Sequence, residues 1–140
     1  MKKINLSKSP EGFKLLEHRS AYGELVGPIF QKIKDNRFIL GFRVDKKHIN
    51  LGGFAHGGML ATFADIVMGH FETRDFEGKT VTVKMNIDFI SVANLGDWVE
   101  GSSRLINKSS EFSFVDTIVY TKQRKILTAS AMFKNIYKKL

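Results

Sequence analysis

Residues 57–73 read GGMLATFADIVMGHFET and form the longest run of helical periodicity in the chain. At about 100° per residue, Met59 and Phe63 share one face of a helix, and Leu60 and Val67 lie beside that face. Apolar side chains therefore cover most of the circumference. A helix of this kind is buried rather than laid on the surface of a protein. We expect a central helix that the rest of the chain encloses.

The sequence around this helix is typical of antiparallel strands. From Val81 to Phe89, apolar and polar residues alternate with a period of two. Further strands are expected at 98–106, 112–121 and 126–137, with turns at 94–97, 108–110 and 122–125. Before the helix, 28–34 and 37–44 are predicted to form a hairpin that turns at Asp35–Asn36.

A short N-terminal helix is also predicted. Ser9, Pro10 and Glu11 are the residue types that open a helix, and Phe13 and Leu16 follow at helical spacing up to about residues 20–23. Together these elements predict an α+β chain with a single domain over residues 1–140. The predicted arrangement is the hotdog fold, in which an antiparallel, curved sheet of about six strands wraps around one central helix.

Composition narrows the function classes. Lys and Arg number 22 against 14 Asp and Glu, so the net charge is +8, and cysteine is absent. Without cysteine, disulfides, thiolate nucleophiles and cysteine-ligated metal sites are excluded. The charge fits an anionic partner or a simple solvated surface, and the basic residues are spread along the chain. We expect a soluble, cytoplasmic protein that binds neither nucleic acid nor membranes, since no motif beyond net charge supports either.

Two features of the helix could carry chemistry. Asp65 lies on its narrow non-apolar sector, where a carboxylate is costly unless it is hydrogen-bonded or used. His56, Gly57 and Gly58 open the helix, where free backbone N–H groups and the helix dipole can hold an anion or an oxyanion. A structural Asp and a tight glycine turn would explain the same residues. Both interpretations stay open on the pattern alone.

Residues 50–58, NLGGFAHGG, continuing to Asp65, resemble the N-x-x-G-x-x-H-G-G-x(6)-D motif of hotdog acyl-CoA thioesterases of the PaaI-like type. The likeness implies that Gly57 polarises the thioester carbonyl, that Asn50 supports this pocket, and that Asp65 of a neighbouring subunit is the general base or nucleophile. Thr82 would position the attacking water. His56 would orient the loop or touch the thioester.

The resemblance also implies a homodimer that assembles into a homotetramer, with acyl-CoA as substrate and no separate cofactor or metal ion. Its other expected substrate contacts lie near the helix start, on the next strand and in the later turns: His56, Gly58, Lys84, Phe89, Ser91, Asn94, Asn107, Lys108, Ser109 and Asn135. The turn at 108–110 departs from the family, which often has Gly and basic residues there.

Three other functions compete with thioester hydrolysis. A hotdog protein could bind acyl-CoA without turning it over, although such a binder needs no base at Asp65. A hotdog dehydratase would need a longer motif with a differently placed His, which the sequence lacks. A nucleic-acid-binding module has only the net charge in its favour. Hydrolysis is therefore the favoured function.

Overall fold

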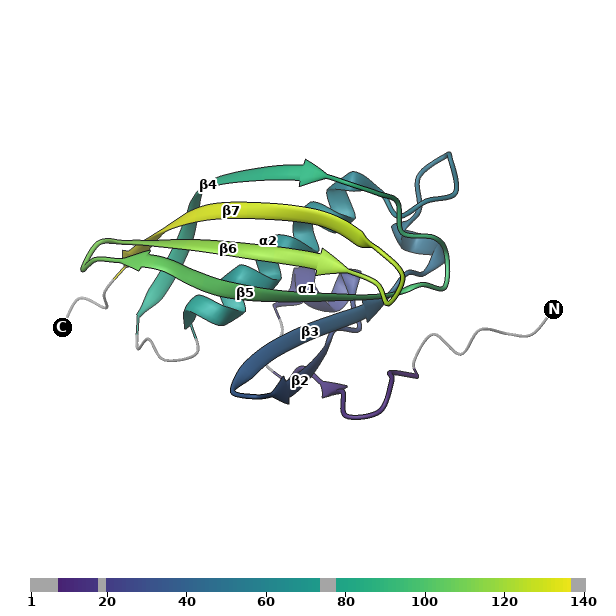
Figure 1. The fold of residues 1–140 in the computed structure, drawn as a ribbon, viewed down its shortest axis with the longest axis horizontal. Helices are drawn as coiled ribbons and strands as arrows, with labels where there is room; N and C mark the ends of the chain where they lie inside the picture. Colours follow the sequence, from purple (N-terminus) through teal and green to yellow (C-terminus); the bar gives the residue numbers. More distant parts are fainter. Residues whose placement is uncertain (1–7, 18–19, 74–77, 137–140) are drawn as a thin grey trace.

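The computed structural model describes residues 8–17, 20–73 and 78–136. Its helices are α1 (Ala21–Val26) and α2 (Gly57–Thr73), and a short 3-10 turn, η1 (Lys46–His48), lies between them. The strands are β1 (Lys14–Leu15), β2 (Phe30–Lys34), β3 (Arg37–Arg43), β4 (Lys79–Phe89), β5 (Trp98–Lys108), β6 (Phe112–Tyr120) and β7 (Lys125–Ile136). They form one antiparallel sheet in the order β1-β2-β3-β5-β6-β7-β4 (Figure 1).

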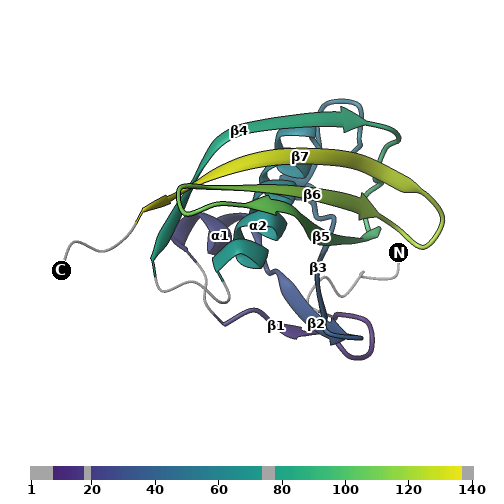
Figure 2. The ribbon, with the colours of Figure 1, turned by 60° about the vertical axis from the view of Figure 1, so that its left-hand side comes forward.

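The sheet curves around α2, as Figure 2 shows, so the predicted hotdog fold is confirmed. Leu60, Phe63, Ala64, Val67 and Met68 are all at most 3% exposed. They pack against the inward-facing residues of the long strands in one continuous core. The sheet therefore encloses the apolar side chains that the sequence predicts around the helix.

The predicted hairpin and turns are also where the sequence places them. Asp35 and Asn36 both adopt positive φ, at 52° and 59°, which matches the tight turn between β2 and β3. The turn before β5 closes when Asp97 N donates to Asn94 O at 3.0 Å, with Gly96 at a φ of 88°. Tyr137, the expected end of the last strand, lies outside the described residues.

The prediction of a helix starting at Ser9 is wrong. Gly12 has a φ of +86°, which stops a helix there. Phe13 is buried with its ring 5.0 Å from that of Trp98. Lys14 and Leu15 then form β1 against β2. The N-terminal helix starts instead after Ser20, whose side chain accepts a hydrogen bond from Gly23 N.

β4 is the last strand in the sheet order, and among the described residues it pairs only with β7. Its other edge has backbone groups without a neighbouring strand, and Val81 and Val83 on it are 47% and 51% exposed. Such an edge can pair with a strand of another chain. No helix in the described residues is long and apolar enough to cross a membrane.

We predict that Gly101→Ala lowers the free energy of unfolding by about 1–3 kcal/mol, because it forces the sheet away from α2. A Cβ at Gly101 would lie 2.9 Å from Cγ2 of Val67 and 3.1 Å from Cε1 of Phe63. Denaturant unfolding measures the change. Ser130→Ala, on the exposed face of β7, is the control and should change little. Equal stability of the two variants would contradict this account of the packing.

Candidate functional site

Asp65 and Thr82 meet between α2 and β4. The Thr82 hydroxyl donates a hydrogen bond to Oδ1 of Asp65 at 2.7 Å. Both side chains are partly buried, so the carboxylate keeps a polar partner where water is restricted. Oδ2 of Asp65 takes no part in this hydrogen bond. The two residues that the sequence proposes for water activation therefore lie together in one chain.

A cavity of about 500 Å³ adjoins this pair. Its walls are formed by α1 and the residues that flank it, by α2, by the start of β4 and by the end of β7. Asp65 and Thr82 line it together with Leu16, Ser20, Gly23, Ile29, Ile66, Gly69, His70, Thr80 and Phe133. The pair therefore faces a space that can hold a small molecule or part of one.

The start of α2 is built by His56. Its Nδ1 accepts a hydrogen bond from Gly58 N at 2.8 Å, and its carbonyl accepts one from Leu60 N at 3.1 Å. Gly57 is the first residue of the helix. Among the described residues its N–H has no acceptor, as expected for the first turn of a helix. A Cβ at Gly57 would lie 3.6 Å from Cζ of Phe89, so Phe89 covers this position.

Asn50 shapes the loop that leads to the helix. Its Oδ1 accepts hydrogen bonds from Gly52 N at 2.9 Å and from Phe54 N at 3.2 Å. Its backbone N–H donates to Phe54 O at 2.8 Å, which closes the loop on itself. In the described chain, therefore, the Asn50 side chain supports the loop before Gly57 rather than reaching towards Asp65.

His48 ties this loop to α1. Its Nδ1 accepts from Asp45 N at 2.9 Å, so Nε2 carries the proton and donates to Val26 O at 2.5 Å. The His48 carbonyl in turn accepts from His56 N at 2.7 Å, directly before the helix start. Burial lowers the pKa of His48 below its ordinary 6.5, and the bond to Val26 partly offsets this. The ring is thus kept neutral in this arrangement.

Within one chain, the two proposed halves of the site lie apart. Gly57 and Asp65 are eight residues apart on α2, which is about 12 Å at the rise of an α-helix. Near the helix start are Ser91, whose hydroxyl donates to Lys125 O at 2.5 Å, and Asn94, whose N–H donates to Asp97. Lys84 is exposed on β4, beyond an irregularity in its pairing.

The remaining expected contacts lie at the opposite end of the sheet. Asn107 and Lys108 end β5 and are exposed, and Ser109 forms the turn to β6. Asn135 is buried, and its Nδ2 donates to the carbonyls of Ser109 and Ser110 at 3.4 and 3.3 Å. Because β5 spans about 33 Å, these residues cannot meet Asn94 within one chain.

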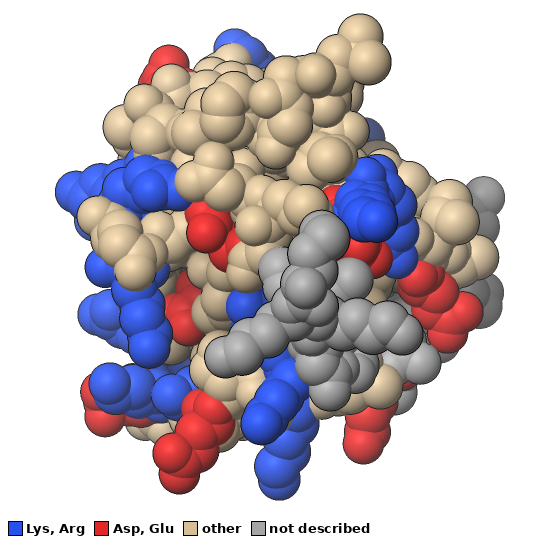
Figure 3. Space-filling model, turned by 90° about the vertical axis from the view of Figure 1, so that its right-hand side faces the viewer, with Lys and Arg blue, Asp and Glu red and all other residues tan. Residues whose placement is uncertain are grey.

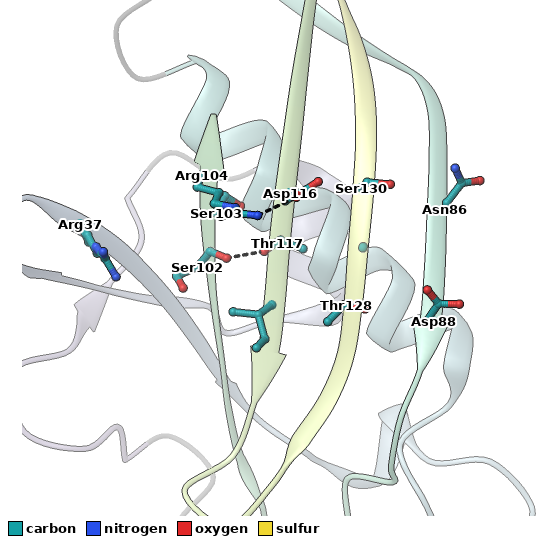
Figure 4. A pocket seen from close by; sticks show the side chains of 12 residues that line it. Arg37, Asn86, Asp88, Ser102, Ser103, Arg104, Asp116, Thr117, Thr128 and Ser130 are labelled. Carbon is teal, nitrogen blue, oxygen red and sulfur yellow. Dashed lines mark hydrogen bonds and ion pairs between the residues drawn. The ribbon is translucent and has the colours of Figure 1, made fainter. Parts of the chain in front are cut away.

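A second hollow, of about 620 Å³, lies on the face of the sheet turned away from α2 (Figure 4). Polar side chains line it, including Asp88 and Ser130, and Arg104 forms an exposed ion pair with Asp116 at 3.3 Å. None of the residues proposed from the sequence lines this hollow. The candidate site is therefore the smaller cavity beside Asp65.

The end of the molecule that carries the start of α2 is mixed in character. Figure 3 shows an upper area with few charges, and below it Lys and Arg side chains with Asp and Glu side chains among them. Leu51 and Phe54 of the loop before α2 are exposed at this end, as are Ile90 and Val92 after β4. An anionic ligand with an apolar part would find both kinds of surface here.

Comparisons with known proteins identify the family of this chain. A family model of the thioesterase superfamily matches residues 52–128. A Pseudomonas aeruginosa protein named "Putative esterase PA0474" is 35% identical over 127 residues, covering 89% of this chain and 95% of the relative. The chain belongs to the thioesterase superfamily.

Solved structures share the fold of this thioesterase-superfamily protein. The Escherichia coli PaaI protein from the phenylacetic acid degradation operon has a TM-score of 0.76 at 17% identity, over 84% of this chain and 86% of PaaI. The BH2602 protein from Bacillus halodurans, solved with CoA, has a TM-score of 0.77 at 18% identity, over 89% of this chain and 83% of BH2602. The fold is therefore shared with these proteins, while the family model and the Pseudomonas relative confirm the thioesterase superfamily.

Sequence reasoning missed two residues of this superfamily member that hold the site together. His48 has no role in the prediction from sequence, and its contacts to Val26 and His56 join segments that no local pattern connects. Arg124 likewise has no role there, yet its Nε donates to Val92 O at 2.8 Å and its guanidinium pairs with the carboxylate of Asp97 at 2.9 Å. Neither contact has a signal in the sequence.

We predict that neutral His48 makes the stability of this thioesterase-superfamily protein depend on pH. Above pH 6.5 the ring is neutral in both states. Below it the unfolded chain binds a proton before the folded chain does, because the folded pKa is lowered. The free energy of unfolding should therefore fall on acidification, by at most about 1.4 kcal/mol per pH unit from this group.

Denaturant unfolding at pH 7.5 and 5.5 measures this loss in the wild type and in His48→Asn. Asn can still accept from Asp45 N but cannot titrate. The variant should lose less stability between the two pH values than the wild type does. Equal losses would show that His48 does not contribute to the pH dependence.

Proposed function

We propose that the protein hydrolyses acyl-CoA thioesters to a free acid and CoA. The observation that carries this proposal is the Asp65–Thr82 hydrogen bond of 2.7 Å on the wall of a cavity of about 500 Å³. A carboxylate held beside a hydroxyl suits the activation of a water molecule. Membership of the thioesterase superfamily and the CoA bound to BH2602 support the choice of substrate.

The chain's own groups can supply each step. Oδ2 of Asp65 accepts one hydrogen of the attacking water, and a lone pair of Thr82 Oγ1 accepts the other, so the water oxygen faces the thioester carbon. As the water attacks, Asp65 takes its proton. The Gly57 N–H and the positive end of α2 stabilise the oxyanion. CoA leaves as a thiolate, because a thiol pKa near 8.5 requires no strong acid. The reaction uses no bound cofactor.

Two chains are needed to complete this site. A carbonyl cannot lie about 3 Å from both Gly57 and Asp65 of one chain, because α2 separates them by about 12 Å. The open edge of β4 supports pairing with a second copy, antiparallel across a two-fold axis. In the proposed dimer, Asp65 of one subunit would lie towards the helix start of the other. We propose a homodimer on this ground, and a homotetramer by family resemblance.

The same pairing offers a place for the coenzyme. In the proposed dimer, the end of the sheet with Asn107, Lys108, Ser109 and Asn135 would lie towards the partner's loop before β5. That loop contains Ser91 and Asn94. The net charge of +8 favours an anionic ligand such as CoA. We propose that these residues, with His56, Gly58, Lys84 and Phe89, contact the substrate. The cytoplasmic location stays a prediction.

We predict that Asp65→Asn lowers kcat at least 100-fold, because the amide keeps the shape of the side chain but cannot take a proton. Free-thiol release from a panel of acyl-CoAs measures it. Thr82→Val is the companion variant, since it removes the hydroxyl and keeps the volume. A loss of only a few-fold in Asp65→Asn would defeat the proposed base. Acyl-CoA binding without turnover in the wild type would favour an acyl-CoA-binding protein.

A mixing experiment tests the two-chain site. Gly57→Pro removes the proposed carbonyl donor, while proline suits the first position of a helix. We predict that Gly57→Pro and Asp65→Asn are each inactive. Unfolded and refolded together, they should recover about one quarter of wild-type activity, since half the dimers are mixed and each holds one intact site. No recovery, with mixed dimers shown by mass spectrometry, would rule out sharing between subunits.

A further inference from the structure

We propose that Val83 is a positioning residue: as the extra residue of a β-bulge, it bends β4 so that the hydroxyl of Thr82 points at Asp65. The inference rests on the proposed hydrolysis and adds a residue that acts through Thr82. It concerns the backbone of Val83 rather than its side chain, which is 51% exposed.

The extra residue is evident from the pairing of β4 with β7. Thr82 lies opposite Phe133 and Lys84 lies opposite Met132, so Val83 has no partner on β7. Such a β-bulge bends the strand that carries it and increases its twist. Figures 1 and 2 both show β4 changing direction part-way along its length. Because the pairing of these two described strands has no other irregularity, the bulge accounts for the bend.

The bulge also changes which residues of β4 face α2. Residues directly opposite each other in an antiparallel pair have their side chains on the same face of the sheet. After the bulge, Met85 and Ile87 pack against the core, and Met85 lies opposite the buried Ala131. Before the bulge, Thr82 lies opposite the buried Phe133. The inward face therefore passes from odd-numbered to even-numbered residues at Val83.

Burial of apolar side chains does not explain this change of face. A regular strand that keeps Met85 inside would also turn Val81 and Val83 inwards, and would turn Thr82 outwards. In the bulged strand Val81 and Val83 are instead 47% and 51% exposed, whereas Thr82 is partly buried. The hydrophobic effect opposes that exchange. The hydrogen bond of 2.7 Å from Thr82 to Asp65 is the interaction that the bulge makes possible.

The place of the bulge in its strand points the same way. Two other register shifts among the described strands lie between Leu105 and Asn107 and between Val119 and Tyr120. Both are close to the hairpin that joins the paired strands, where the turn sets the register. Val83 lies inside β4, directly after Thr82. A bulge can also protect an edge strand from pairing with other chains, a use that needs no relation to Thr82.

Deletion of Val83 tests the role of the bend. Thr82 and Lys84 already lie opposite consecutive residues of β7, so the deletion straightens β4 and keeps Thr82 on the inner face. We expect kcat for acyl-CoA hydrolysis to fall about 100-fold, because a misplacement of about 1 Å can cost that much. Val83→Ala keeps the extra residue, and φ is not positive at this position, so its loss of kcat should be far smaller.

Thr82→Val, made in both backgrounds, separates a misplaced hydroxyl from general damage. The substitution should lower kcat in the full-length chain and cause little further loss after the deletion, where the hydroxyl is already out of place. Losses that multiply overturn the proposal, and so does an unchanged kcat after the deletion. An unchanged kcat together with larger oligomers in light scattering would assign the bulge to protection of the edge.

The free energy of unfolding gives a readout that needs no turnover. The effects of Asp65→Ala and Thr82→Val should be non-additive in the full-length chain, because the two side chains share a hydrogen bond. They should become additive when Val83 is deleted. Non-additivity that persists overturns the proposal. Absence of turnover in the wild type on every acyl-CoA defeats the proposed function instead, and this measurement still decides the role of Val83.

A full-length variant covers the case in which the deletion does not fold. Thr82→Val combined with Val83→Thr moves the hydroxyl by one position along β4. This double variant should be as slow as Thr82→Val, because position 83 faces away from Asp65. Recovery of kcat towards the wild-type value would show that position 83 reaches Asp65, and would overturn the proposal.

Discussion

A helix whose side chains are apolar on nearly every side must be covered on nearly every side, and a single sheet covers α2. Leu60, Phe63, Ala64, Val67 and Met68 are all at most 3% exposed. Curvature brings the long strands around them, and the sheet ends at β4 rather than closing into a barrel. Asp65 lies at this open margin with Thr82 from β4. The same constraint that buries the helix thus leaves one carboxylate in a cavity.

Features that depend on local periodicity could be predicted from the sequence. The helix at 57–73, the alternation from Val81 to Phe89 and the turn at Asp35–Asn36 each follow from residues close together in the chain. The roles proposed for Asp65 and Thr82 came from the motif and its surroundings, because periodicity alone left a structural Asp equally open. Their hydrogen bond places them together, and activity measurements have to decide what they do.

Features that depend on distant contacts could not be predicted. Residues 9–16 have the composition of a helix start, yet the contacts of Phe13 with Trp98 and of Leu16 N with Ile29 O draw them into the sheet. Tertiary packing overrides a weak helix preference in such a segment. His48 links α1 to the segment before α2, and its partner Val26 lies more than twenty residues earlier in the chain. The ring must be neutral to accept from Asp45 N and donate to Val26 O at the same time.

Glycine shows most clearly why placement matters more than residue type. Gly53 and Gly96 are required by positive φ, Gly41 and Gly101 by contacts with side chains, and Gly57 lies first in a helix, where its N–H is available. In the sequence these positions look alike, and only the surrounding atoms separate them.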